Sequence, residues 1–201
     1  FFENGGDLCY VQIMAHVGDD AMAALEAGLE IVAHYDEYDL ICAPDIMWPH
    51  APGSNVWEDA RSSQHISIMQ RAVVAHCERM GDRLAILDSL PTTSTDPASI
   101  QQHDIRSPNA ALYYPWLRVA DGPQATAGYV PPCGHVAGVF ARTDRQQGVH
   151  KAPANETLEG VVDLAVKLTD EEQGPLNEGG INCIRAFPRR GIRVWGARTL
   201  S

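Results

Sequence analysis

The feature of this sequence that most constrains its fold is an alternation of short apolar runs with longer stretches of helical periodicity. Apolar runs that favour strands occupy residues 8–13, 39–43 and 83–88. Between them, apolar residues recur at helical spacing over about 20–35 and about 62–80. A strand–helix–strand–helix–strand order is built from parallel strands joined by right-handed crossovers. We therefore predict an α/β fold that starts with a βαβαβ unit.

In the second half of the chain the predicted elements form a mixed α+β pattern. Thr169 and Glu172 have the spacing of a capping box, which predicts a short helix after them. A turn over 188–191 joins two final strands, so the chain ends in a strand-turn-strand unit. We expect about 1–120, the βαβαβ-type part, and about 121–201, a helix plus strands, to share one core. The remaining predicted elements are a strand over 111–119 broken at Pro115, a helix over 133–143, and strands over 161–166, 181–187 and 192–197.

Charge and composition exclude several classes of protein. The 201 residues carry a formal net charge of -11, and 45% of them are hydrophobic. That apolar content suffices for a sizeable core and excludes a disordered chain. An acidic chain is a poor binder of phosphate backbones, so we expect no nucleic-acid partner. No apolar run reaches the roughly 18 residues of a membrane helix, so we expect no membrane insertion.

The cysteines are predicted to be buried and reduced. They include no CxxC pair, their number is odd, and several lie in apolar strand-like runs. Such cysteines are typical of a protein that folds in the cytoplasm, where disulfides are rare. The five positions are Cys9, Cys42, Cys77, Cys133 and Cys183.

Polar residues at the ends of predicted strands raise the question of an active site. Ligands of open parallel sheets bind at the carboxyl ends of the strands. A small α/β hydrolytic or metal-dependent enzyme that uses Asp45, His50 and Asp88 is therefore one interpretation, and His16 lies at a similar place. No HxH, HExxH or DxD spacing joins any two of these residues, and the chain lacks GxGxxG, GxxxxGK[ST] and GxSxG motifs. We predict no catalytic residue, no cofactor and no metal site, and the enzyme remains the alternative.

Two long segments are rich in aromatic residues, proline, glycine and arginine. They cover residues 108–120 and 129–156. Enzymes carry such segments around a cleft, whereas assembly proteins use them as subunit contacts, where Tyr, Trp and Arg are enriched. In the absence of a catalytic constellation, these segments favour an assembly protein.

Four motifs, in the same order, carry a resemblance to a known family. Together they resemble the contractile tail sheath proteins of phages and of related bacterial contractile injection systems. The motifs are FFENGGDLCYV (residues 1–11), SPNAALYYPW (107–116), PPCGHVAGVFARTDRQQGVHKAPAN (131–155) and LNEGGINCIRAFPRRGIRVWGARTLS (176–201).

The resemblance implies a structural function without enzymatic activity or cofactors. Sheath subunits polymerise as stacked hexameric rings around an inner tube and contract to drive that tube through a target envelope. The implied partners are other sheath subunits, the inner tube protein, and the baseplate and tail terminator proteins. The implied location is the bacterial cytoplasm during assembly, and afterwards a phage tail or a phage tail-like particle.

Sheath proteins of this family are longer than this chain. They have an N-terminal arm before the FFENGG motif and a C-terminal domain after the last motif, and neither is in this sequence. The chain begins Phe1-Phe2 without a basic segment before an apolar stretch, which predicts no signal peptide. We therefore expect residues 1–201 to be the central part of a sheath protein.

Arginines are the candidates for contacts between subunits. We expect the loops at 44–57, 91–107 and 142–156 to be exposed. Arginines in or near such loops would bind acidic residues of neighbouring subunits, although Arg142 and Arg145 have the alternative of pairing with acids of their own chain. The interface candidates are Arg142, Arg145, Arg189 and Arg190.

Overall fold

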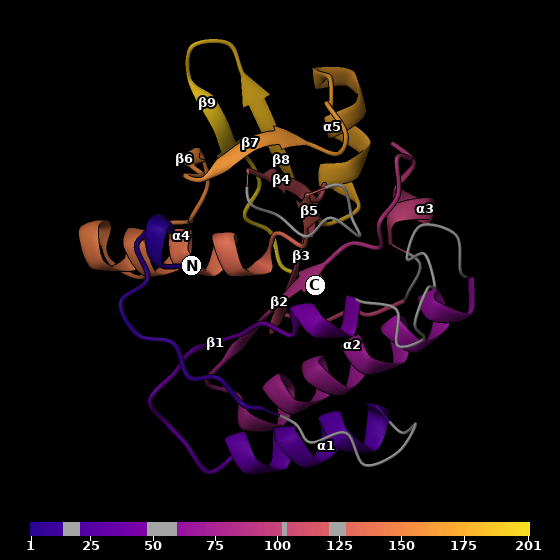
Figure 1. Ribbon diagram of the computed structural model, residues 1–201, viewed down its shortest axis with the longest axis vertical. Coiled ribbons are helices and arrows are strands. Elements are labelled where there is room, and N and C mark those ends of the chain that lie inside the picture. Colours follow the sequence, from indigo (N-terminus) through magenta and orange to yellow (C-terminus); the bar gives the residue numbers. More distant parts are fainter. Residues whose placement is uncertain (14–20, 48–59, 102–103, 121–127) are drawn as a thin grey trace.

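The computed structural model describes residues 1–13, 21–47, 60–101, 104–120 and 128–201. These residues form a six-stranded mixed sheet, a three-stranded antiparallel sheet, and helices on both faces of the larger sheet (Figure 1). The helices are η1 Phe2–Asn4, α1 Ala21–Val32, η2 Pro44–Met47, α2 Ala60–Met80, α3 Pro97–Ile100, α4 Cys133–Gln147 and α5 Asp170–Glu178. The strands are β1 Leu40–Ile41, β2 Leu84–Asp88, β3 Ala110–Tyr114, β4 Leu117–Val119, β5 Tyr129–Val130, β6 Glu156–Thr157, β7 Val161–Leu164, β8 Ile181–Phe187 and β9 Gly191–Val194.

The larger sheet joins the two halves of the chain. Its strand order is β1-β2-β3-β8-β9-β6. The first four strands in this order are parallel, and β9 pairs antiparallel with both β8 and β6. The predicted α/β class, mixed toward the C-terminus, is confirmed. So is the final strand-turn-strand, in which β8 and β9 form a hairpin whose register pairs Phe187 with Gly191.

The two faces of the larger sheet bury different helices. On β2, Ala85 and Leu87 belong to the core beneath α1 and α2, whereas Ile86 faces α4. Successive strand residues point to opposite faces, so a strand covered by helices on both sides is apolar throughout. This explains why the 83–88 run shows no polar alternation before it reaches Asp88.

The chain leaves the large sheet at Pro115, as the predicted break requires. β3 ends at Tyr114, the Tyr114–Pro115 peptide bond is cis, and β4 then pairs with β5 and β7 in the smaller sheet. Trp116 lies at the junction between the sheets, where its indole N–H donates to the Ser89 carbonyl at 2.9 Å. Trp116 therefore links the start of the smaller sheet to the segment that follows β2.

Helix ends are placed by the local signals expected of them. Gly81 follows α2 with a φ of 76°, and its N–H donates to the Cys77 carbonyl at 2.8 Å. At α5, Thr169 and Glu172 form the predicted capping box. The helix predicted over 133–143 is longer than expected, because α4 continues to Gln147 before Gly148 ends it. Arg142 and Arg145 therefore lie in the last turns of a helix, not in a loop.

The prediction of a first strand over 8–13 is wrong. Residues 7–13 belong to no helix or strand, and they are exposed. Cys9 is exposed as well, contrary to the expectation of a buried thiol. An apolar run favours an extended backbone, but a strand also needs the edge of a neighbouring strand to pair with. In the described residues, the sheet begins at β1, after α1.

None of the described helices combines the length and apolar character that a membrane span requires.

Candidate subunit interface

The N-terminal motif folds against helix α4. Asn4 is fully buried, and Gly138 gives its backbone room beside the helix: a Cβ there would lie 2.7 Å from the Asn4 Cβ and would overlap the Phe1 carbonyl oxygen. Gly5 has a φ of 106°, and a Cβ at that position would lie 2.6 Å from the Arg142 Cβ. The Asn-Gly-Gly sequence is therefore the part of the motif that allows close approach to α4.

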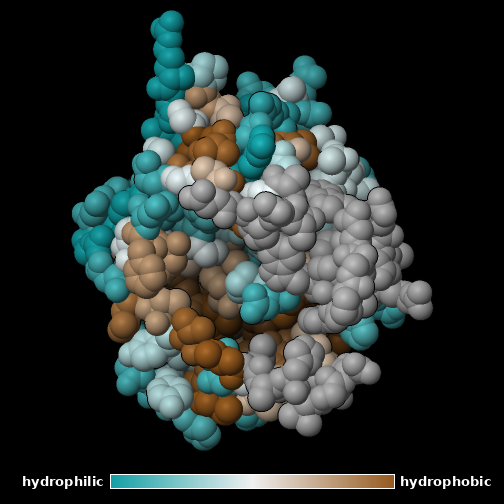
Figure 2. All heavy atoms as spheres, viewed as in Figure 1, coloured by the Kyte–Doolittle hydropathy of each residue, from teal (hydrophilic) through white to brown (hydrophobic). Residues whose placement is uncertain are grey.

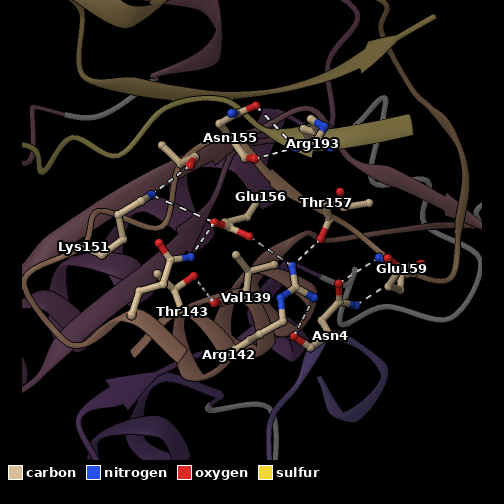
Figure 3. A network of polar contacts seen from close by, with 12 residues as sticks. Asn4, Val139, Arg142, Thr143, Lys151, Asn155, Glu156, Thr157, Glu159 and Arg193 are labelled. Atoms are coloured by element: carbon tan, nitrogen blue, oxygen red, sulfur yellow. Dashed lines mark hydrogen bonds and ion pairs between the residues drawn. The ribbon is translucent and has the colours of Figure 1, made fainter. Parts of the chain in front are cut away.

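Arg142 connects three segments that are distant in the sequence (Figure 3). One guanidinium nitrogen donates to the Asn4 carbonyl at 3.1 Å, and the other donates to the Thr157 carbonyl at 2.6 Å. The Glu156 carboxylate lies 3.8 Å from the second nitrogen. The side chain of Arg142 is 17% exposed. Its planar donors thus hold η1 and β6 against α4 from inside the chain.

Asn4 completes this arrangement with a pair of hydrogen bonds. Its amide nitrogen donates to the Glu159 carbonyl at 3.2 Å, and its amide oxygen accepts from the Glu159 backbone N–H at 2.9 Å. These hydrogen bonds stabilise the fold, because a buried polar group without a partner costs about 1–3 kcal/mol of folding free energy. Figure 3 shows Asn4, Arg142 and Glu159 lying together between α4 and the segment after β6.

Arg145 lies one turn further along α4 and is half-exposed. It forms an ion pair with Asp7, and its second nitrogen donates to the Gly5 carbonyl at 3.1 Å. The side chain of Asp7 is 76% exposed. An ion pair of this exposure contributes little to stability. Arg145 is therefore accessible from solvent, in contrast to Arg142.

The tip of the β8–β9 hairpin carries the other two candidate arginines. Arg189 and Arg190 are both exposed, and Arg189 has a φ of 62°. Below them, the rings of Phe187 and Trp195 lie 4.6 Å apart, and the Arg190 guanidinium stands 5.7 Å from the Phe187 ring centre. Rigid aromatic residues beneath cationic side chains are typical of binding surfaces.

A second exposed surface is apolar. Leu8, Tyr10, Val11 and Ile13 are between 52% and 83% exposed, and the segment passes Tyr38, whose ring lies 6.3 Å from that of Tyr10. Figure 2 shows hydrophobic side chains along the path that residues 7–13 follow in Figure 1. A contiguous apolar strip on a soluble body is characteristic of an interaction surface.

The two described residues of the enzyme alternative, Asp45 and Asp88, lie in different surroundings. Asp45 is exposed at the start of η2, and Asp88 is buried at the end of β2. His16 and His50 lie outside the described residues. Across the described ranges, no group of three or more His, Cys, Asp and Glu side chains is arranged to hold a metal ion.

Asp88 is buried against the first residue of α4. Its Oδ1 accepts the Cys133 backbone N–H at 2.7 Å, at the first residue of α4. Burial raises the pKa of Asp88 to about 7, although hydrogen bonds from Cys133 act in the opposite direction. The pKa of the Cys133 thiol is raised by its interaction with the Cys42 thiol, by burial, and by the Asp88 charge.

Sequence reasoning did not find Asn4 or Gly138 as partners. A signal for the second was present: glycines at 134 and 138 are spaced one helical turn apart in α4, and such spacing permits close approach on one face. Only the folded structure shows that the approaching segment is the chain's own N-terminus.

The described residues form a mixed α/β body that carries exposed arginines and an exposed apolar strip. Residues 16–200 match the family model of the phage tail sheath protein central domain. The chain belongs to this family, which confirms both the resemblance carried by the four motifs and the expectation that it is not an enzyme.

Relatives and solved structures agree with this assignment. The chain is 28% identical over 141 residues to a prophage major tail sheath protein of Pseudomonas aeruginosa, covering 66% of this chain and 36% of that protein. It resembles a chain of the anti-feeding prophage helical sheath in the contracted state, with 32% identity and a TM-score of 0.72. A chain of the anti-feeding prophage baseplate gives 30% identity and a TM-score of 0.73.

The chain is shorter than the proteins that it resembles. Both structural matches cover 100% of this chain, but only 49% of the sheath chain and 48% of the baseplate chain. It thus spans about a third of the Pseudomonas protein and about half of the structural matches.

Proposed function

We propose that this chain is the central body of a sheath subunit, which assembles with copies of itself around an inner tube and contracts to drive the tube through a target envelope. The observation that carries the proposal is the match of residues 16–200 to the sheath central domain. The similar solved chains are components of a contracted helical sheath and of a baseplate. We therefore assign to this protein contacts with other sheath subunits and with the baseplate. The particle is a phage tail or an injection particle that is assembled in the bacterial cytoplasm. The inner tube and the tail terminator complete the set of proposed partners.

The described surfaces support self-association. The strip formed by Leu8, Tyr10, Val11 and Ile13 exposes large apolar side chains, each of which gains roughly 1.5–3 kcal/mol from complete burial. In the proposed assembly a neighbouring subunit covers this strip. The formal net charge of -11 supports a protein-only assembly without nucleic acid.

The four arginine candidates divide into two roles in this proposal. Arg189 and Arg190 are exposed at a hairpin tip, where Arg190 also donates to the Asn155 side chain at 3.0 Å. Arg145 is half-exposed on α4 and pairs with the exposed Asp7. Because all three are accessible from solvent, they are proposed to meet acidic residues of neighbours. Arg142 donates within its own chain, so its contribution to assembly is to hold the N-terminal segment in place. The loop over 91–107 is a further proposed contact, and most of the loop over 44–57 lies outside the described residues.

Electron microscopy of the full-length protein with its inner tube protein tests the proposal. We expect tubular polymers of regular stacked rings in negative stain. The double variant Arg189→Glu/Arg190→Glu reverses the charge at the hairpin tip and should reduce polymer yield at least several-fold while leaving the circular dichroism spectrum unchanged. Arg71→Glu is the matched control, because Arg71 is a half-exposed arginine on α2 that pairs with Asp104.

Two results would contradict these assignments. A full-length protein that stays dispersed beside its tube protein, under conditions where a known sheath polymerises, would overturn the sheath function. Normal polymers from the hairpin double variant would show that Arg189 and Arg190 are not interface residues, but they would not contradict the sheath function.

A further inference from the structure

Beneath the first turn of α4 lie a carboxyl and two thiol groups that the proposed function does not use. Asp88 accepts the Cys133 backbone N–H at 2.7 Å, and the Cys42 Sγ lies 3.5 Å from the Cys133 carbonyl oxygen. Both Cys42 and Cys133 are free cysteines. The Cys42 thiol also interacts directly with the Cys133 thiol, which in turn contacts the Asp88 carboxyl. Cys42 and Asp88 therefore both lie against Cys133.

The topology of the sheet brings these residues together. β1 and β2 are parallel, and Ile41 is in register with Ala85, so Cys42 and Asp88 emerge on the same face, toward α4. Cys133 is the first residue of that helix. The cluster thus lies at the carboxyl ends of two neighbouring strands, and it joins β1 to α4.

The three groups differ in access to solvent. Cys133 is 0% exposed and Asp88 is 3% exposed, whereas Cys42 is only half-buried. A small oxidant from solvent can reach Cys42, and the other thiol is shielded behind it. Burial therefore sets an order in which the two cysteines can react.

We propose that Cys42 and Cys133 are a peroxide-oxidisable pair that closes into a disulfide, with Asp88 as the base that receives the Cys133 proton. In the first step the Cys42 sulfur attacks the O–O bond of hydrogen peroxide, gives Cys42 sulfenic acid, and releases water. In the second step the Cys133 sulfur attacks the Cys42 sulfur and displaces the hydroxyl group. The Cys133 proton passes to Asp88 and then to the departing oxygen, which leaves as the second water. Two thiols lose two electrons in total, and the peroxide accepts them.

Asp88 suits the role of base because of its position. A deeply buried thiol has a raised pKa and is a poor nucleophile until its proton is removed. The pKa of Asp88, raised by burial to about 7, allows this carboxyl to exchange a proton near neutral pH. The inference does not depend on the sheath function, since it concerns the central body alone.

The test is peroxide oxidation of the full-length protein carrying Cys9→Ser, which removes the exposed Cys9 thiol. After mild treatment with hydrogen peroxide, peptides are mapped by mass spectrometry without reduction. We expect a peptide pair joined through Cys42 and Cys133 with the loss of two hydrogen atoms. Cys77 and Cys183 are internal controls, because burial raises the pKa of each to about 12 and both should remain unmodified.

Variants separate the two steps of the reaction. Cys133→Ser should leave a sulfenic acid on Cys42 that dimedone traps. Asp88→Asn keeps an oxygen that accepts the Cys133 N–H but removes the base, so disulfide closure should slow roughly tenfold or more while the first oxidation keeps its rate. Circular dichroism and thermal unfolding of both variants verify the fold.

Three outcomes would overturn the proposal. The first is a Cys42 that resists peroxide in the folded protein. The second is a Cys42 that accumulates sulfenic or sulfinic acid in the presence of Cys133 without forming the disulfide. The third is an Asp88→Asn variant that closes the disulfide at the parental rate, which would exclude Asp88 as the base.

Discussion

Gly138 of helix α4 faces Asn4 so closely that a Cβ at the glycine would stand 2.7 Å from the Asn4 Cβ. The N-terminal 3-10 turn and the helix are thus in backbone contact, and the hydrogen bonds of Asn4 with Glu159 depend on that contact. A single missing side chain on α4 therefore determines where the start of the chain lies.

The first prediction concerns this glycine. Gly138→Ala should lower the free energy of unfolding by about 1–3 kcal/mol, because the added methyl group forces the N-terminal turn away from α4. Gly134→Ala in the same helix is the matched control: no atom lies within 4 Å of its Cβ position, so the change should stabilise by about 0.5–1 kcal/mol. Urea denaturation of both variants measures the difference, and equal effects would contradict the close contact.

The second prediction separates Arg142 from Arg145. Arg142→Ala removes hydrogen bonds to the Asn4 and Thr157 carbonyls and should cost about 2–3 kcal/mol of stability. Arg145→Ala removes a largely exposed ion pair with Asp7 and should cost less than about 1 kcal/mol. Limited proteolysis should cleave the N-terminal segment of the first variant faster. Similar stability of the two variants would show that Arg142 is not the internal link described here.

The third prediction concerns the pH dependence of stability through Asp88. The pKa of Asp88 is raised from 3.8 to about 7, so the folded state holds its proton more tightly than the unfolded state does. This contribution to stability is complete below pH 3.8 and is lost as the pH rises to about 7; the total is about 4 kcal/mol. Relative to the parent, Asp88→Asn should therefore gain stability as the pH rises from 3.8 to about 7. A difference independent of pH would contradict a buried titrating carboxyl.

The fourth prediction concerns Arg83, whose side chain is fully buried. Its guanidinium donates to the Tyr38 hydroxyl at 2.5 Å and to the Tyr35 carbonyl at 3.0 Å, and so connects the start of β2 to the segment between α1 and β1. Arg83→Lys should cost about 2–4 kcal/mol, because an ammonium group cannot replace a planar fork of donors. Arg79→Lys is the control, since Arg79 is exposed beside Glu30 and should tolerate the change. Thermal unfolding compares the two.

Local sequence signals predicted those elements whose stabilising contacts are also local. The capping box at Thr169, the stop at Gly81 and the break at Pro115 each depend on a residue type with a specific backbone preference. The buried β2 and β3 strands followed from uninterrupted apolar runs. For these elements, the sequence pattern and the folded structure agree within a few residues.

Features that depend on distant partners were not predictable. The run over 8–13 has the residues of a strand, but no neighbouring edge pairs with it in the described structure. The helix predicted over 133–143 continues to Gln147, and hydrogen bonds from Arg142 to the Asn4 and Thr157 carbonyls hold distant segments against its last turns. The apolar run predicts that Arg83 begins a strand, and its sequence neighbours give no indication that its charge is buried. Contacts across long sequence separations leave little trace in a single sequence.

The position of Arg142 has a mechanical consequence for a protein of the sheath family. Its guanidinium donates hydrogen bonds to the backbone of residue 4 and to the backbone of β6, and β6 is an edge strand of the large sheet. A tension applied at residue 4 therefore reaches this edge of the sheet through the side chains of Arg142 and Asn4, without passing through α1, α2 or the strands between.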